Sequence, residues 1–240
     1  MTSSSASSRG LTLRFTDLVG ATSLKAEKGD EVAGQLIARH RDHVKQLAQA
    51  NHGRIISWAG DGCFLTFETP SAAVRFALNL QKVHGSETDL PKVYVGIHMG
   101  EVVEKTGPGG ESGPPLVEGL AVDIASRIQS LALPGQILMS GAVFNSARPR
   151  LNVQEIDAPI SWQAHGAYLF KDLDEHIQIG EVGITGVSPL HAPVASKKVQ
   201  RAATILEEES LGWRPAPGLA IPGRRNWVLE SQLGTGAVGE

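Results

Sequence analysis

The sequence lacks several features that would assign it to a special class of protein. Its 240 residues contain a single cysteine, Cys63, so no disulfide can form within the chain and we expect a reducing, cytoplasmic setting. No run of about 18 apolar residues is present, so no membrane span is predicted. The serine-rich start has no apolar segment, which predicts a disordered tail over residues 1–9 and not a secretory signal. The net charge of −3 gives no reason to expect a nucleic-acid partner.

Glycine and proline, in contrast, are plentiful, and their distribution divides the chain. Of the 27 glycines and 13 prolines, the glycines up to about residue 182 stand singly between periodic segments, as turn residues do. From residue 183 to 222 the pattern is looser and richer in proline, which is typical of a linker, and a short helix is possible near residues 197–208. We therefore predict a globular domain over residues 10–184 and a linker over residues 185–222.

Hydrophobic periodicity predicts the elements of that domain. Alternation at residues 11–16 predicts a half-buried strand, and a long helical stretch follows Gly20 as far as Asn51. Further helices are expected from Pro70 and over residues 120–131. The other predicted strands are residues 54–58, 63–67, 93–99, 101–105 (as the hairpin partner of 93–99), 136–140, 167–170 and 176–182. This order predicts an α+β sandwich, a mainly antiparallel sheet with helices packed on it.

Two aspartates stand at ends of predicted strands. Asp17 closes the first strand, and Asp61 lies in the turn GDG at residues 60–62. If the strands are neighbours, the carboxylates can meet and bind Mg²⁺, which prefers carboxylates together with substrate phosphate oxygens. The glycine-containing turn after Asp17, residues 18–22, enters a helix and offers N–H groups to a phosphate chain. The alternative is that Asp17 is a helix N-cap and Asp61 a plain turn residue.

A second pair stands on a predicted helix. Asp123 and Arg127 are one helical turn apart on a shared face. Arg127 could stabilise charge on phosphorus during phosphoryl transfer. Alternatively, the two residues form a surface ion pair worth about 0.3–0.5 kcal/mol.

Taken together, these segments resemble class III nucleotide cyclase catalytic domains. The similarity covers about residues 11–182. It consists of FTDLVGAT at 15–22, GDG at 60–62, GIHMGEV at 96–102, VDIASR at 122–127, PGQILMS at 134–140 and the ending between residues 162 and 182, in the order and spacing of that family. The resemblance implies a ferredoxin-like α/β sandwich and a homodimer with active sites across its two-fold interface.

The resemblance also implies a role for each motif. Asp17 and Asp61 would hold two metal ions, Mg²⁺ or Mn²⁺, with the Leu18 carbonyl as a further ligand. The phosphates would lie against the turn made by Val19, Gly20, Ala21 and Thr22. Arg127 of the partner copy would stabilise the transition state as the 3′-oxygen attacks the α-phosphorus and pyrophosphate leaves.

Several positions depart from the family pattern. Asp123 stands where the family usually has a ribose-orienting asparagine, and Ala21 where a phenylalanine is frequent. The two base-reading positions are Ser57 and Leu116, in place of a lysine and an aspartate. The pair that would read adenine is therefore absent, and so is the guanine-reading pair. ATP is expected as the commonest substrate of the family, with GTP, CTP and UTP open.

The last residues resemble the start of another domain. Residues 223–240 read as a strand followed by G-x-G-x-x-G, which is similar to the opening strand and glycine-rich loop of a protein kinase. The chain stops before any kinase catalytic residue, so we expect a fragment of a longer cyclase–linker–kinase protein. Two functions are thus expected, an active cyclase that makes cyclic AMP, or a weakened cyclase-like dimer that binds nucleotide and regulates an attached kinase.

Overall fold

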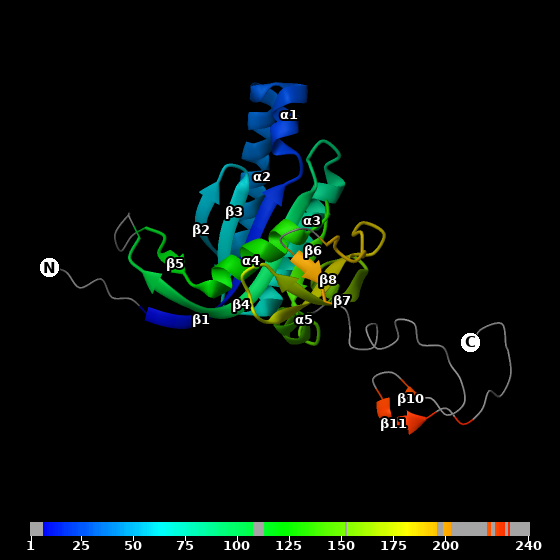
Figure 1. The fold of residues 1–240 in the computed structure, drawn as a ribbon. Helices are drawn as coiled ribbons and strands as arrows, with labels where there is room; N and C mark the ends of the chain where they lie inside the picture. The colour runs from blue at the N-terminus through cyan, green and yellow to red at the C-terminus, as the bar shows by residue number, and fades with distance from the viewer. Residues whose placement is uncertain are drawn as a thin grey trace.

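The computed structural model describes residues 7–107, 113–151, 153–195, 199–202, 220–221, 224–228 and 230. These residues form an α+β fold in which one large sheet is covered by helices on both faces (Figure 1). The strands of this sheet are β1 (Ser7–Leu18), β2 (Arg54–Ala59), β3 (Gly62–Phe67), β4 (Val93–Lys105), β5 (Leu116–Glu118), β6 (Ile137–Ser140), β7 (Ile160–Phe170), β8 (His176–Ile184) and β9 (Val199–Arg201). A separate small sheet pairs β10 (Ala220–Ile221) with β11 (Arg224–Val228).

The strand order is β2-β3-β1-β4-β6-β8-β7-β9, with β5 paired to β4. Of the pairs that the structure describes, only β4 with β6 is parallel, so the predicted mainly antiparallel sheet is confirmed. The helices are α1 (Ala21–Lys28), α2 (Asp30–Ala50), α3 (Pro70–Ser86), α4 (Leu120–Leu131) and α5 (Gly141–Ala147), with a short 3₁₀ turn at Val153–Glu155.

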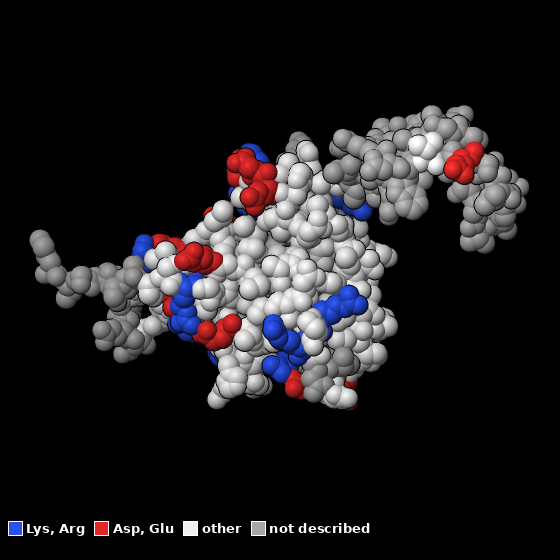
Figure 2. All heavy atoms as spheres, turned by 90° about the horizontal axis from the view of Figure 1, so that it is seen from below, with Lys and Arg blue, Asp and Glu red and all other residues white. Residues whose placement is uncertain are grey.

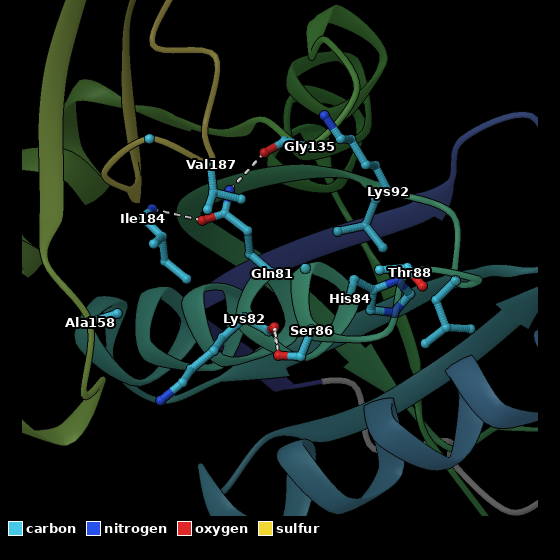
Figure 3. Close-up of a pocket in the computed structure, with 14 residues that line it drawn as sticks. Gln81, Lys82, His84, Ser86, Thr88, Lys92, Gly135, Ala158, Ile184 and Val187 are labelled. Atoms are coloured by element: carbon cyan, nitrogen blue, oxygen red, sulfur yellow. Dashed lines mark hydrogen bonds between the residues drawn. The ribbon is translucent and has the colours of Figure 1, made fainter.

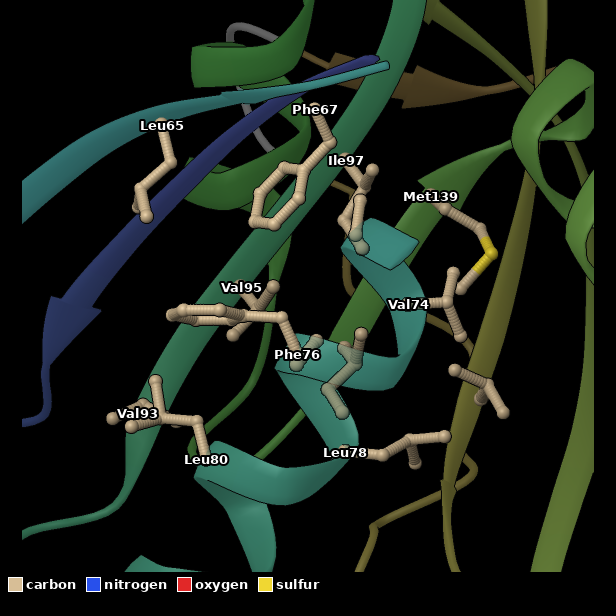
Figure 4. Close-up of a cluster of buried hydrophobic side chains, with 14 of the residues drawn as sticks. Leu65, Phe67, Val74, Phe76, Leu78, Leu80, Val93, Val95, Ile97 and Met139 are labelled. Carbon is tan, nitrogen blue, oxygen red and sulfur yellow. The ribbon is translucent and has the colours of Figure 1, made fainter. Parts of the chain in front are cut away.

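The core lies mainly between the sheet and helices α2, α3 and α5. Its buried apolar side chains come from the central strands and from α3 (Figure 4). Helix α4 packs on the opposite face, against residues of β1, β3, β4 and β5. Pro70 takes the first helical position as expected, and Thr69 caps α3 by accepting a hydrogen bond from the Ala72 N–H at 3.3 Å.

The prediction that the first strand is half-buried is wrong. β1 lies inside the sheet between β3 and β4, with helices over both faces, so Thr12, Arg14 and Thr16 are buried along with the apolar residues between them. The strand also starts at Ser7, inside the segment for which a disordered tail was expected, because residues 7–10 pair with residues 101–104 of β4.

Two further boundaries differ from the prediction. The long helix is interrupted at Gly29, whose φ of 81° favours glycine, so that α1 and α2 are separate helices. Residues 101–105 do not fold back as a hairpin partner. They continue β4, because β1 is long enough to pair with the whole of it.

The sheet continues beyond the predicted end of the domain at residue 184. Within the segment 197–208, for which a short helix was expected, residues 199–201 form β9, which pairs with β7. Residues 197–198 and 203–208 lie outside the described residues. Glu181, fully buried in β8, accepts hydrogen bonds from the Ser188 hydroxyl at 2.9 Å and from the Leu190 N–H at 2.9 Å. The described residues 185–195 and 199–202 are therefore packed against the domain, inside the region for which a linker was expected.

The surface carries charges of both signs. Figure 2 shows one face of the molecule, on which charged side chains gather in small groups around a broad uncharged area. Within the described part of the chain, no helix has the length and hydropathy needed to span a membrane.

The contacts of residues 185–202 lead to a test of the domain boundary. A chain ending at Ile184 lacks the two groups that donate hydrogen bonds to the buried Glu181 carboxylate. Each hydrogen bond lost by a buried group costs about 1–3 kcal/mol of stability. We expect its melting temperature to be roughly 10 °C lower than that of a chain ending at Ala202. Calorimetry on the two truncated proteins measures the difference. Equal melting temperatures would contradict a structural role for this segment.

Candidate active site

The first candidate site lies where β1 ends beside the β2–β3 hairpin. Thr16 of β1 is paired with Cys63 of β3, and the two-residue turn Gly60-Asp61 precedes β3. This register brings the turn to the end of β1, where the Leu18 N–H donates a hydrogen bond to Oδ2 of Asp61 at 3.0 Å. The structure therefore brings Asp17 and Asp61 together, and the N-cap of α1 is Gly20 and not Asp17.

Two glycines permit this close approach. Gly60 has a φ of 63°, which the tight turn requires. A Cβ at Gly62 would lie 3.2 Å from Oδ1 of Asp17 and 3.2 Å from the Ala59 carbonyl oxygen. A larger residue at position 62 would push the hairpin away from the Asp17 carboxylate.

The electrostatics of this pair are unfavourable in the free protein. The pKa of Asp17 is raised to about 7, mostly by burial and in addition by hydrogen bonding to the Asp61 carboxyl and charge repulsion from it, against an opposite effect of the Leu18 backbone. Two carboxyl groups this close do not both ionise readily below neutral pH. A bound cation would remove this repulsion.

The donor set fits a hard divalent cation. Carboxylate oxygens are the ligands that Mg²⁺ and Mn²⁺ prefer, and the part of the chain that the structure describes gathers no cluster of three or more His, Cys, Asp or Glu side chains. Ions at Asp17 and Asp61 would thus need further oxygens from the backbone, from water or from a phosphate group.

The predicted phosphate loop follows directly. Gly20, with a φ of 67°, precedes α1, which begins at Ala21. The Val19 N–H donates to the Lys92 carbonyl oxygen at 2.8 Å, so Val19 does not offer its N–H to a phosphate. The amides of Ala21 and Thr22 lie in the first turn of α1, where helix N–H groups have no partner inside the helix.

Arg127 and Asp123 lie on α4, which packs on one face of the sheet over β4 and β1. The Arg127 Nη1 donates to the Lys171 carbonyl oxygen in the β7–β8 turn. Together with Ser130, Asp172 and Val194, Arg127 lines a hollow of about 420 Å³. Asp123 is exposed, and the described residues contain no ion pair between it and Arg127, so the surface-pair alternative is not observed. Within one chain, Arg127 is directed to the β7–β8 turn, whose strands are separated from β1 by β4 and β6 in the sheet.

The two predicted base-reading residues are also far apart within one chain. Ser57 is paired with Phe64, which is paired with Phe15, so Ser57 lies on the same sheet face as Asp17. Leu116 is paired with Lys105 at the far end of β4. Phe15 is paired with Gly96, so Leu116 is displaced along β4 by roughly 30 Å from the row that contains Ser57.

One residue at the site was missed by sequence reasoning. Arg41 of α2 donates through Nη2 to the Gly60 carbonyl oxygen, and its guanidinium lies 5.1 Å from the centre of the Trp58 ring. It therefore holds the turn that carries Asp61 from the helix side. No local sequence pattern distinguishes Arg41 from other arginines. Its role follows from its position on α2 facing the hairpin, which is known only from the tertiary fold.

A separate cavity of about 700 Å³ lies between the end of α3, the start of β4 and the end of β8 (Figure 3). His84, Lys92 and Val187 are among the residues that line it, and Gln81 crosses it to bind the Gly135 carbonyl oxygen at 2.7 Å and the Ile184 N–H at 2.8 Å. None of the predicted site residues lines this cavity.

Known proteins resemble the chain in sequence and in fold. Residues 4–165 match the family described as the adenylate and guanylate cyclase catalytic domain. An adenylate cyclase of Glutamicibacter nicotianae is 28% identical over 148 residues, which cover 60% of this chain and 35% of that protein. The chain thus spans about a third of the length of this relative.

Two solved structures have a similar fold. The adenylyl cyclase CyaB from P. aeruginosa superimposes with a TM-score of 0.62 at 21% identity, covering 74% of this chain and 95% of that chain. The guanylyl cyclase Cya2 gives a TM-score of 0.61 at 21% identity, covering 79% and 99%. The predicted fold class is thereby confirmed.

The raised pKa of Asp17 predicts a pH dependence of stability. Its pKa is about 7 in the folded protein against 3.8 as its ordinary value. The protonated carboxyl therefore contributes stability that is fully present below about pH 3.8 and is lost as the pH rises through 7. We expect the free energy of unfolding of the metal-free wild type, relative to that of Asp17→Asn, to fall between pH 5 and pH 8. Urea titrations with a chelator measure it.

The matched control for this measurement is Asp42→Asn, which changes an exposed aspartate on α2. It should leave the pH dependence of the wild type in place. Parallel stability curves for the wild type and Asp17→Asn over this range would show that Asp17 titrates as an ordinary aspartate.

Proposed function

The chain belongs to the adenylate and guanylate cyclase catalytic domain family, and we propose that it converts ATP to 3′,5′-cyclic AMP and pyrophosphate at sites shared between two copies. The observation that carries this proposal is the convergence of Asp17 and Asp61 at the end of β1. Because the chain spans about a third of its curated relative, the activity of the whole protein is part of the proposal.

Asp17 and Asp61 are the residues that would hold two Mg²⁺ or Mn²⁺ ions, with the Leu18 carbonyl as a further ligand. Such ions lower the pKa of the ribose 3′-hydroxyl and offset the charge of the triphosphate. The amides of Ala21 and Thr22, which follow Gly20 in its left-handed conformation, are available to the phosphates. Val19 contributes by fixing the loop to Lys92, the residue before β4, and not as a phosphate donor.

Arg127 would act on the site of the partner copy. In one chain its guanidinium lies toward the β7–β8 turn, on the other side of β4 from Asp17, which supports a site completed by a second copy. A two-fold dimer gives each copy both roles. Arg127 would stabilise the negative charge that develops on the α-phosphate. Asp123, one turn earlier and exposed, would hydrogen-bond the ribose in place of the usual asparagine.

The choice of base rests on Ser57 and Leu116. These two residues lie far apart in one chain. A site shared between two copies would bring Ser57 of one copy and Leu116 of the other to the same nucleotide. Ser57 offers one hydrogen bond and Leu116 none, so discrimination between bases is expected to be weak. The choice of ATP follows the adenylate cyclase relatives.

A second candidate function is a nucleotide-binding dimer with weak turnover that regulates an attached kinase. The exposed Asp123 carboxylate beside a triphosphate and the absence of a base-reading pair favour this alternative. In the predicted kinase-like segment, residues 223–240, a strand is present at Arg224–Val228, and the glycine-rich run 234–239 lies outside the described residues.

An activity assay separates the two functions. We expect the purified chain with Mn²⁺ to produce a cyclic nucleotide from ATP, with GTP, CTP and UTP tested in parallel. Asp17→Ala removes a metal ligand and should lower turnover on the order of 100-fold or more. Asp42→Ala is the control that should retain activity. If the wild type makes no more product than Asp17→Ala from any of the four nucleotides, the second function is favoured.

Mixing two inactive variants tests the shared site. Asp17→Ala and Arg127→Ala each damage a different half of the site, so a mixed dimer keeps one intact site of its two. Equal amounts of both variants form mixed dimers in about half of the population, and activity should recover to about a quarter of the wild-type value. No recovery in a sample with verified mixed dimers would contradict a site built across the interface.

A further inference from the structure

Arg14 lies in the middle of the hydrophobic core. Arg14 and Leu18 are four residues apart on β1, so their side chains lie on the same face of the sheet, the one that α2 and α3 cover. The side chain of Arg14 is 0% exposed. The residues paired with it on the neighbouring strands are Leu65 and Ile97, both fully buried (Figure 4). Its guanidinium carbon lies 4.1 Å from the centre of the Phe76 ring of α3.

The guanidinium donors have no acceptor in the described chain. Its Nε, Nη1 and Nη2 atoms are all buried and lack a hydrogen-bond partner among the described residues. The Phe76 ring attracts the cation from one face, but the N–H groups point outward in the guanidinium plane and are not satisfied by that contact. A buried charge without a partner is costly, so these donors require an acceptor.

The charge of Arg14 is not balanced by a neighbouring side chain. Burial lowers the pKa of Arg14 to about 9, so the group is still cationic at neutral pH. No ion pair to it occurs among the described residues. The Cys63 thiol nearby is not a counter-ion, because burial raises its pKa to about 12.

Two histidines facing this region are neutral. His84 Nδ1 lies 2.6 Å from the Pro91 carbonyl oxygen and must donate to it, so His84 Nε2 accepts from His40 Nδ1 at 3.1 Å. Burial lowers the pKa of His40 to about 3, with the charges of His84 and Arg14 acting in the same direction and that of Asp61 against it. Neither histidine therefore supplies a negative charge to Arg14, and the Nε2 atom of His40 is itself buried without a partner among the described residues.

We propose that Arg14 and Thr16 form a buried site for a small monovalent anion of chloride size, between β1 and helices α2 and α3. The Thr16 hydroxyl lies two residues along the same face, is 2% exposed and has no partner among the described residues, so it can donate to the same anion. The apolar flanks and complete burial exclude a large or highly charged ligand. The site lies behind Asp17 and Asp61, on the opposite face of the sheet.

Halide-dependent stability of the intact chain tests this site. Thermal unfolding is followed in sodium chloride or bromide against sodium gluconate, whose anion is too large for the site, at constant ionic strength. At halide concentrations about 100 times the dissociation constant, the melting temperature of the wild type should rise by roughly 5–10 °C, and the rise should saturate. Arg14→Met, apolar and of similar length, should lose this difference between salts.

The matched control is Arg148→Met, which removes an exposed arginine lying over an aromatic ring, Phe144. It should keep the halide effect of the wild type. Anomalous diffraction from wild-type crystals grown in bromide should show a bromide ion at the Arg14 guanidinium, and this readout holds even if Arg14→Met fails to fold. A wild-type melting temperature that is the same in halide and gluconate, or a map with only water at Arg14, would overturn the proposal.

Discussion

The pairing of β1 on both edges is the constraint on which the rest of the structure depends. Its register with β3 places Thr16 opposite Cys63, and this alone determines that the Gly60-Asp61 turn arrives beside Asp17. Its register with β4 extends from Ser7 to Leu18 and keeps β4 continuous. A slip of one residue in either pairing would turn Asp17 to the other face of the sheet and separate the two carboxylates.

The same register determines where α4 lies, through two glycines of β4. A Cβ at Gly96 would lie 2.1 Å from the Gln129 backbone nitrogen, and one at Gly100 would lie 2.7 Å from Cβ of Ala121. Helix α4 therefore packs directly on the backbone of β4, and any larger residue at these positions would lift it. Since Arg127 lies between these two contact points along the helix, the glycines of the GIHMG segment fix the direction in which Arg127 points.

The sequence predicted the elements and the two carboxylates better than it predicted their surroundings. The hairpin at Gly60-Asp61 and the helix start at Pro70 depend on local turn and helix-start chemistry, which a single sequence carries. The burial of Arg14 and the hydrogen bond from Arg41 to the hairpin depend on which elements pack against each other, and local periodicity does not contain that information. The continuous β4 was missed for the same reason, because its second half is stabilised by residues 7–10, far away in sequence.

Each face of β1 carries a charged side chain that no oppositely charged side chain of the described residues balances. The charge is negative on one face and positive on the other. On the α4 face, Asp17 and Asp61 repel each other unless a cation binds, as the raised pKa of Asp17 indicates. On the α2–α3 face, Arg14 is buried among apolar side chains without a carboxylate. The two groups cannot neutralise each other, because side chains on opposite faces of a strand are separated by the backbone and its hydrogen-bonded neighbours. With the proposed cation on one face and the proposed anion on the other, each face would bind an ion of its own, and binding on either face would stabilise the β1–β3 pairing that both sites share.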